Sequence, residues 1–236
     1  WGQGVQTTVL EVLQNAIEMR GRDFEYLDFS GRKYTLGEID DRSQELARGL
    51  VAAGAKKGEC VASVLDNSIE QILLLFACAQ IGAVHVPLNT AYKGEFLRHQ
   101  VSDCAAPVLV AEKEYVDRLI EVEDGLPDAK ALFVKGPMGD RKSRKLKLAP
   151  LDEAFVTEGA AVECTTKPGD LAMLIYTAGT TGPSKGCMVS QNYVCNMARQ
   201  IGTGSYYNKD DVVWTPLPGF HMNLYTATII SSLQVG

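Results

Sequence analysis

The 236-residue sequence lacks the features that define several large protein classes. Its longest apolar run, residues 72–79, falls far short of the ~20 residues that a membrane-spanning helix requires. Its first residues do not place an apolar stretch after a basic one, so they predict no secretory signal peptide. Positive charge is not in excess, because the net charge is -6 at pH 7. This balance argues against nucleic-acid binding as the main role.

Paired cysteine motifs are also missing. The six cysteines form no Cys-x-x-Cys pair, and most of them lie in apolar segments, as buried free thiols do. This usage suits a reducing compartment better than a secreted disulfide framework, so we predict a cytoplasmic protein without a transmembrane segment. A monomer and a homo-oligomer are both compatible with the sequence. The cysteines are Cys60, Cys78, Cys104, Cys164, Cys187 and Cys195.

The order of the expected elements indicates an α/β fold. Residues 8–19 have apolar side chains at helical spacing, and residues 24–29 and 32–34 read as two strands around a turn. Thr35 and Glu38 have the spacing of a capping box, which predicts the start of a second helix. Strands and helices then alternate, with strands expected at 60–65, 83–86, 107–111 and 130–134 and helices at 69–80, 93–101 and 113–122. This alternation predicts layers of helices on the faces of a largely parallel or mixed sheet.

Three regions follow from this pattern. We expect a first α/β unit at about 1–135, an exposed excursion rich in Gly, Pro and Lys at about 136–150, and a second α/β unit at about 165–236. Asn67 and Ser68 are expected to cap the helix at 69–80. His85 lies inside an apolar strand, which favours a hydrogen-bonded core residue over a ligand-binding one.

The stretch from Tyr176 to Gly186, YTAGTTGPSKG, has the composition of a phosphate-binding loop. It follows an expected strand at 171–176 and precedes an extended segment at 187–189, after which Ser190 is a suitable helix N-cap. Glycines let backbone N–H groups approach a ligand, and the Thr and Ser hydroxyls add donors. Lys185 supplies a positive charge.

The spacing does not fit a Walker A loop. That loop requires G-x-x-x-x-G-K-[ST], whose last residue binds magnesium. Counted from Gly179, Ser184 occupies the position of the second glycine and Gly186 that of the Ser or Thr. A P-loop ATPase is therefore disfavoured. A flexible linker is disfavoured as well, because linkers seldom hold one lysine between a buried strand and a capped helix.

The loop instead resembles the phosphate loop of the adenylate-forming (AMP-binding) superfamily, whose pattern is Y-T-S-G-T-T-G-x-P-K-G. Ala178 replaces the usual serine, and Pro183-Ser184 stands in place of x-Pro, which keeps the lysine in register. Residues 34–39, YTLGEI, and 82–89, GAVHVPLN, resemble two earlier motifs of the same superfamily and come in the same order. The resemblance implies the N-terminal part of the large domain of an acyl-CoA synthetase or ligase.

A second motif follows residues 212–217, which we expect to form a strand ended by proline. Phe220-His221 resembles the superfamily motif P-L-[FP]-H, which lies beside the acyl pocket. The resemblance gives His221 a catalytic role, orienting the substrate carboxylate or stabilising nearby charge, and it gives Phe220, His221 and Asn223 a role in substrate binding. The alternative for His221 is a cap on the following helix. Relatives that activate amino acids have an aspartate at this position, so a fatty or related acid without an α-amino group is expected.

The resemblance also implies a two-step reaction. A carboxylate attacks the α-phosphorus of ATP, giving acyl-AMP and pyrophosphate, and coenzyme A then displaces AMP. ATP, Mg²⁺ and coenzyme A are therefore implied, with a small-molecule carboxylic acid as substrate. Mg²⁺ is assigned, through the ATP phosphates, to Thr180 and Thr181. The nucleotide phosphates are assigned to Thr177, Ala178, Gly179, Thr180, Thr181, Gly182, Ser184 and Lys185.

Later motifs of the superfamily are missing from these residues. We find no Y-G-x-T-E motif with its magnesium-binding glutamate, no ribose-binding aspartate, no hinge and no C-terminal domain with its catalytic lysine. We therefore expect an incomplete N-terminal portion of an acyl-CoA ligase that is inactive when isolated. The alternative is a non-catalytic nucleotide-binding or interaction fragment of the same fold.

Overall fold

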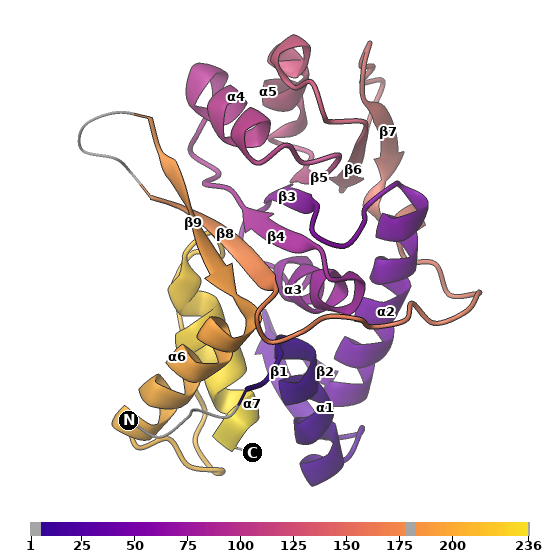
Figure 1. Cartoon of the computed structure of the whole chain (residues 1–236). Coiled ribbons are helices and arrows are strands. Elements are labelled where there is room, and N and C mark those ends of the chain that lie inside the picture. Colours follow the sequence, from indigo (N-terminus) through magenta and orange to yellow (C-terminus); the bar gives the residue numbers. More distant parts are fainter. Residues whose placement is uncertain (1–5, 178–182, 236) are drawn as a thin grey trace.

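A seven-stranded sheet with helices on both faces dominates the part of the chain that the computed structural model describes, residues 6–177 and 183–235 (Figure 1). The strand order is β7-β6-β5-β3-β4-β8-β9, and every neighbouring pair is parallel except β8 and β9. This confirms the α/β fold with a largely parallel sheet. The strands are β3 (Cys60–Val64), β4 (Val84–Pro87), β5 (Val108–Glu112), β6 (Ala131–Lys135), β7 (Lys147–Pro150), β8 (Leu171–Thr177) and β9 (Lys185–Ser190).

The N-terminal elements form as their local sequence predicts. Helix α1 (Val9–Arg20) is followed by an antiparallel ribbon of β1 (Glu25–Phe29) and β2 (Arg32–Thr35), and then by α2 (Leu36–Ala52). The capping box of α2 is present, because Glu38 N donates to Thr35 Oγ1 at 3.1 Å and Thr35 N donates to Glu38 Oε2 at 3.0 Å. Two backbone donors at the helix start are thereby satisfied.

The remaining helices either connect strands of the sheet or follow its last strand, β9. They are α3 (Ile69–Ile81), α4 (Gly94–Asp103), α5 (Val116–Glu121), α6 (Gln191–Gly204) and α7 (Ser231–Val235), with 3₁₀ turns η1 (Glu123–Gly125) and η2 (Leu151–Ala154) and a π-helical segment η3 (Leu224–Ile230). Within the described residues, none of these helices is both long and apolar enough to cross a bilayer. All six cysteines are free, and four of them are buried, as the sequence predicts.

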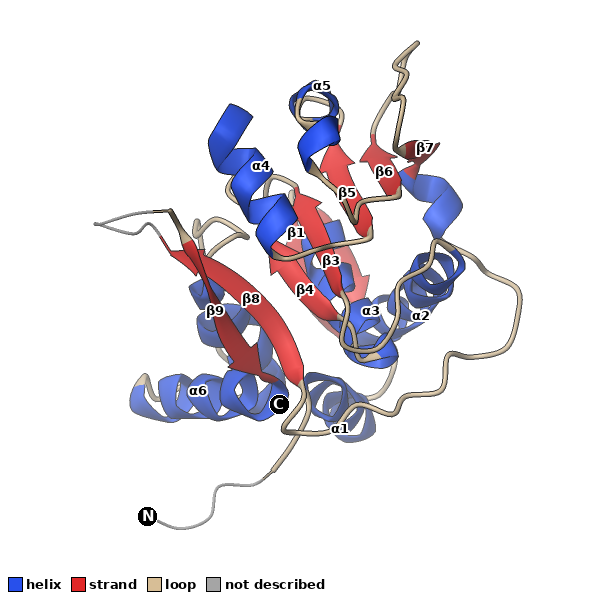
Figure 2. Cartoon of the chain, turned by 45° about the horizontal axis from the view of Figure 1, so that its top comes forward, coloured by secondary structure: helices blue, strands red, loops and turns tan. Residues whose placement is uncertain are grey.

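Two hydrophobic clusters lie on opposite faces of the sheet. Alternate residues of β3 and β5 contribute to them, Val61 and Val108 to the first and Ala62 and Leu109 to the second. Helices α2 and α3 cover the first face, and α4 and α5 cover the second (Figure 2).

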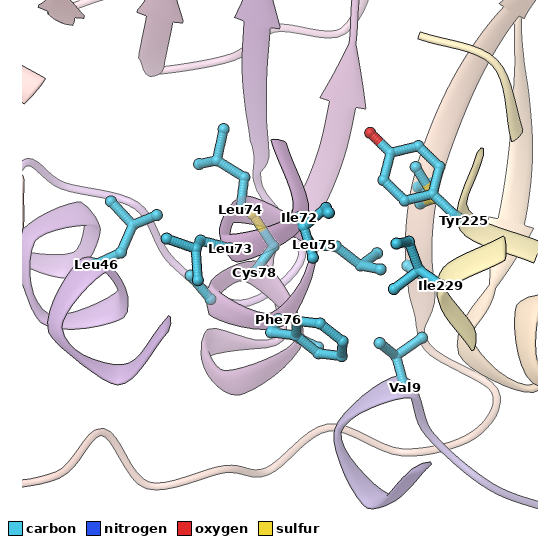
Figure 3. Packing of buried hydrophobic residues seen from close by; sticks show 14 of the residues in the cluster. Val9, Leu46, Ile72, Leu73, Leu74, Leu75, Phe76, Cys78, Tyr225 and Ile229 are labelled. Atoms are coloured by element: carbon cyan, nitrogen blue, oxygen red, sulfur yellow. The ribbon is translucent and has the colours of Figure 1, made fainter. Parts of the chain in front are cut away.

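Helix α3 is the centre of the first cluster and is buried on nearly all sides. Its leucines and Phe76 lie between Leu46 of α2, Val9 of α1 and Ile229 of η3 (Figure 3). A helix that is apolar all round must be enclosed by other elements, which explains why its sequence has almost no polar stripe.

Part of the expected excursion at 136–150 belongs to the sheet. Lys147–Pro150 form β7, which pairs in parallel with β6, and Leu146 is buried beside it. The connecting loop is fixed by the buried carboxylate of Glu123, which accepts hydrogen bonds from the Ser143 hydroxyl and from Arg144 N. The prediction of an exposed excursion is thus wrong for its last residues, because basic residues on an edge strand resemble a loop in sequence.

Residues 212–217 do not form the expected strand. Val212 is 95% exposed and Trp214 is 81% exposed, and the segment is irregular. β-Branched and aromatic residues favour strands only where they pack against a neighbour, and no described strand pairs with this segment.

Ser68 occupies the N-cap position of α3 without making the expected capping bond. Its side chain does not bond to the helix backbone, and Asn67 is used elsewhere. Helix α5 is also shorter than the expected 113–122.

His85 of β4 is fully buried, as expected. Its Nε2 lies 3.1 Å from Ser63 Oγ, which in turn donates to Gln71 Oε1 at 3.0 Å, while Nδ1 has no partner among the described residues. The ring meets Tyr225 edge-on, with centroids 5.9 Å apart. Burial lowers the pKa of His85 to about 3, because the charged imidazolium would lose its hydration.

This imidazole gives the fold a pH dependence. The native pKa of about 3 lies below the ordinary 6.5, so between these values the unfolded chain binds a proton that the native chain does not. The stability that neutral His85 allows is therefore complete above pH 6.5 and is lost as the pH falls toward 3. From about pH 7 to about pH 5 we expect the free energy of unfolding in urea to lose roughly 2 kcal/mol through His85.

A comparison of two variants isolates this effect. His85→Gln should flatten the pH dependence, whereas His221→Gln, which changes an exposed histidine, should leave it steep. Parallel stability–pH curves for the wild type and His85→Gln would contradict the assignment.

Candidate functional site

The predicted phosphate loop connects the two strands of an antiparallel hairpin. β8 ends at Thr177, β9 begins at Lys185, and these two residues are directly paired. Both are exposed, and Ser184 is half-buried. The sequence predicts a strand on each side of the loop, which the structure confirms, although it does not predict that the two strands pair. The other assigned residues, Ala178, Gly179, Thr180, Thr181 and Gly182, lie outside the described residues.

Gly186 allows the hairpin to close beneath Tyr176. A Cβ at Gly186 would lie 3.3 Å from Tyr176 Cζ, so the absence of a side chain leaves room for the ring. The Tyr176 hydroxyl donates to Asp103 Oδ2 at 2.6 Å. Burial, followed by the hydrogen bond to Asp103, raises the pKa of Tyr176, which keeps the phenol protonated as the donor.

Asp103 is the last residue of α4, and the same helix also contacts the hairpin just before β9. His99 Nε2 donates to the backbone oxygen of Ser184 at 2.9 Å, and Gln100 Nε2 donates to Ser184 Oγ at 3.0 Å. These α4 residues are about 85 positions from the loop, and nothing in the local sequence identifies them as neighbours of Lys185.

The second predicted motif lies in a turn that is held by side chains from two directions. Gly219 N donates to Asn67 Oδ1 at 2.7 Å, and Asn67 Nδ2 donates to the Leu217 oxygen at 2.8 Å. The buried Tyr225 hydroxyl donates to the Gly219 oxygen at 2.7 Å. Gly219 also lies against Gln71, whose Nε2 would be 3.1 Å from a Cβ at that position. The turn is thereby fixed to the segment between β3 and α3, to α3 and to η3.

Phe220 and His221 follow this turn directly. Their ring centroids are 4.6 Å apart, with Phe220 half-buried and His221 exposed. Asn223 is also exposed, at the start of the following helix. Among the described residues the His221 imidazole makes no hydrogen bond, so the alternative of a helix cap receives no support. The catalytic and substrate-binding roles of these residues stay predictions.

Both motifs belong to the same edge of the sheet. β3, β4 and β8 are parallel neighbours, so their carboxyl ends point to one edge. Asn67, which holds the Gly219 turn, follows β3, and the phosphate loop follows β8. Ligands of open α/β sheets bind at this edge, which makes it the candidate site.

Two cavities lie near the segment 212–217. One of about 270 Å³ is bounded by Asn67, Trp214 and Leu224, and one of about 540 Å³ lies between β1 and residues 207–214. Neither is lined by Phe220 or His221. Within the described ranges, no group of three or more His, Cys, Asp or Glu residues is arranged to hold a metal ion.

Sequence reasoning missed Asn67 as a support of the site, because an Asn before a helix reads first as a cap. The position of Asn67 just after a parallel strand was the available signal. Asn67→Ala should remove both bonds to the 217–219 turn, lowering the free energy of unfolding by ~1–2 kcal/mol in urea and accelerating amide hydrogen exchange at Gly219.

A milder variant serves as the control. Asn67→Asp keeps the acceptor for Gly219 N and loses the donor to Leu217, so Gly219 should stay protected. Unchanged protection of Gly219 in Asn67→Ala would show that the turn does not depend on Asn67.

Comparison with known proteins agrees with this architecture. A family described as AMP-binding enzyme matches residues 13–236. A 4-coumarate–CoA ligase of Humulus lupulus is 28% identical over 211 residues, 88% of this chain and 38% of that protein. An indoleacetate–CoA ligase of Aromatoleum aromaticum is 30% identical over 228 residues, 96% of this chain and 42% of that protein.

A solved structure shows the same fold. The anthranilate CoA ligase AuaEII in complex with anthranoyl-AMP superposes with a TM-score of 0.86 at 21% identity, over 99% of this chain and 44% of that one. The chain thus spans about two fifths of the length of the proteins that it matches.

Proposed function

The chain belongs to the AMP-binding enzyme family, and on this premise we propose that it carries the phosphate-binding part of an ATP-dependent acid–thiol ligase. The observation that supports this most is the hairpin, in which Lys185 directly faces Thr177 at the two ends of the Gly- and Thr-rich loop. An exposed lysine at the mouth of such a loop can neutralise phosphate charge. Two relatives are named as CoA ligases.

In this proposal, the protein promotes attack of a carboxylate on the α-phosphorus of ATP, with pyrophosphate as the leaving group. Coenzyme A then displaces AMP and leaves the acid as a thioester. Phosphoryl chemistry of this kind needs charge neutralisation and alignment more than covalent help. Lys185, Ser184 and Thr177 would hold the β- and γ-phosphates, together with Ala178, Gly179, Thr180, Thr181 and Gly182.

His221 would act on the carboxylate. Its imidazole is exposed and next to Phe220, so it can donate a hydrogen bond to a substrate oxygen. The Gly219 turn, bonded to Asn67 after β3 and to Tyr225 of η3, would keep the two rings in place.

The donor chemistry of the loop fits Mg²⁺ bound through nucleotide phosphates. Hydroxyl oxygens are ligands that Mg²⁺ accepts, and Thr180 and Thr181 supply them in this motif. The ion would neutralise charge on the phosphates, while the protein residues position them.

We further propose that the acid lacks an α-amino group. His221 cannot compensate a substrate ammonium, as the aspartate of amino-acid-activating relatives would. The named acids of the two relatives, 4-coumarate and indoleacetate, have no amino group on the α-carbon and are aromatic. An aryl or fatty acid without an α-amino group is the class to test first, in a protein that we place in the cytoplasm.

The substrate class can be tested by acid-dependent exchange of labelled pyrophosphate into ATP, measured on the longest reading frame that contains these residues. The panel should include a cinnamic acid, an arylacetic acid, fatty acids of several lengths and α-amino acids. Exchange is expected with one of the first three groups and not with the α-amino acids. Exchange that requires an α-amino acid would contradict the assignment of His221, and ATP binding without exchange for any acid would favour the non-catalytic alternative.

Lys185 can be tested in the same assay. Lys185→Ala should reduce exchange at least about tenfold, since a charge-assisted contact to phosphate is lost. Lys142→Ala, which removes an exposed lysine from the basic loop, should have no effect. Equal exchange in the wild type and Lys185→Ala would remove Lys185 from the phosphate site.

A further inference from the structure

We propose that α4 positions the β8–β9 hairpin, which carries the phosphate loop, through Gln100 and His99, which hold Ser184 next to Lys185. The proposal rests on the proposed function of this hairpin. It makes Gln100 and His99 positioning residues, because they act through Ser184 on the neighbouring cation and not on the nucleotide directly.

The contacts to Ser184 are made by adjacent residues of one helix. His99 Nε2 donates to the Ser184 backbone oxygen at 2.9 Å, and Gln100 Nε2 donates to its hydroxyl oxygen at 3.0 Å. Main chain and side chain of Ser184 are thus both bound. Its position and its side-chain rotamer are fixed together.

The anchor itself is rigid. Gln100 is only 1% exposed, and Leu97 and Val101 on either side of it in the helix are buried in the second hydrophobic cluster. A side chain in such a packed layer has little freedom to follow a moving loop. The hairpin is therefore held to α4, and α4 is held to the sheet.

The other strand of the hairpin is tied to the same helix. The Tyr176 hydroxyl donates to Asp103, which lies four residues after His99 and so on the same side of α4. β4 and β8 are paired at His85 and Met173, and β8 continues to Thr177 with β9 as its partner. A two-stranded ribbon is only marginally stable by itself, so these contacts supply the support that it needs.

The residue at position 184 explains why a tether is useful here. The superfamily pattern has proline at this position, and proline restrains the chain by fixing φ. In this chain the proline stands one residue earlier, at Pro183, so Ser184 leaves φ unrestrained directly before Lys185, but its hydroxyl provides the acceptor that Gln100 uses. The hydrogen bond would then replace the restraint that proline gives. It follows that the importance of Gln100 depends on which residue occupies position 184.

The decisive experiment is a double-mutant cycle between positions 100 and 184. In the longest reading frame that contains this chain, Gln100→Leu should raise the KM for ATP in pyrophosphate exchange about fivefold with kcat nearly unchanged, since a positioning contact to bound phosphates is weakened. In the Ser184→Pro background, Gln100→Leu should leave the KM unchanged or lower it, because the amide then has no hydroxyl to bind. The same KM increase in both backgrounds would overturn the proposal.

Ser184→Ala removes the same hydrogen bond from its other partner, without altering the core of α4. It should raise the KM at least as much as Gln100→Leu, because Ser184 is itself assigned to the nucleotide phosphates, and the double variant should be no worse than Ser184→Ala alone. Additive effects of the two changes would contradict a shared contact. Gln80→Leu is the matched control, since it removes an amide bond to the Val162 oxygen at the end of α3 that precedes β4, whereas the hairpin loop follows the carboxyl end of β8, and it should leave the KM unchanged.

A second readout does not require catalysis. Amide hydrogen exchange of the peptide 183–190 should accelerate in Gln100→Leu and Ser184→Ala and be slow again in the Gln100→Leu/Ser184→Pro variant. Unchanged exchange in the two single variants would refute the tether. If the wild type shows no pyrophosphate exchange with any acid, the proposed function fails, and the hydrogen-exchange result still decides whether α4 holds Ser184.

Discussion

The parallel pairing of β3, β4 and β8 is the constraint on which both candidate segments depend. It brings the carboxyl ends of β3 and β8 to one edge of the sheet, although Val64 and Thr177 are more than a hundred positions apart in sequence. Asn67 and Lys185 would otherwise have no fixed spatial relation. The pairing in turn depends on α3, which covers one face of these strands and is itself enclosed by α1, α2 and η3. Burial of apolar side chains thus determines where the exposed polar groups stand.

Polar groups inside the core link the sheet to the turn that carries Phe220 and His221. His85, Ser63 and Gln71 form a chain of hydrogen bonds beneath Gly219, and Tyr225 both packs on His85 and donates to the Gly219 oxygen. Buried polar groups are costly unless they are bonded, so a hydrogen-bonded chain of this kind accepts few alternative arrangements. The turn is therefore held in place by residues of the core.

The sequence predicted the features whose causes are local. The Thr35–Glu38 capping box, the Ser190 cap of α6 and the strands on either side of the phosphate loop depend on residues within a few positions of one another. The pairing of β8 with β9 and the contacts of α4 with Ser184 join segments that only the tertiary fold brings together, so spacing could not reveal them. The strand predicted at residues 212–217 does not form for the opposite reason: its residues favour a strand locally, but no described strand pairs with them. β7 was not predicted, because a lysine and a proline in an edge strand give a sequence that resembles a loop.

The exposure of Trp214 decides what an optical experiment on this protein would report. The sequence has two tryptophans, Trp1 and Trp214, and the indole of Trp214 is already largely in contact with water in the native fold. Its emission will therefore shift little toward the red when the sheet unfolds. It borders both cavities beside the site, so a molecule that settles there would move the spectrum toward the blue and shield the indole from soluble quenchers. The emission of Trp214 is thus a reporter of occupancy and a poor reporter of folding.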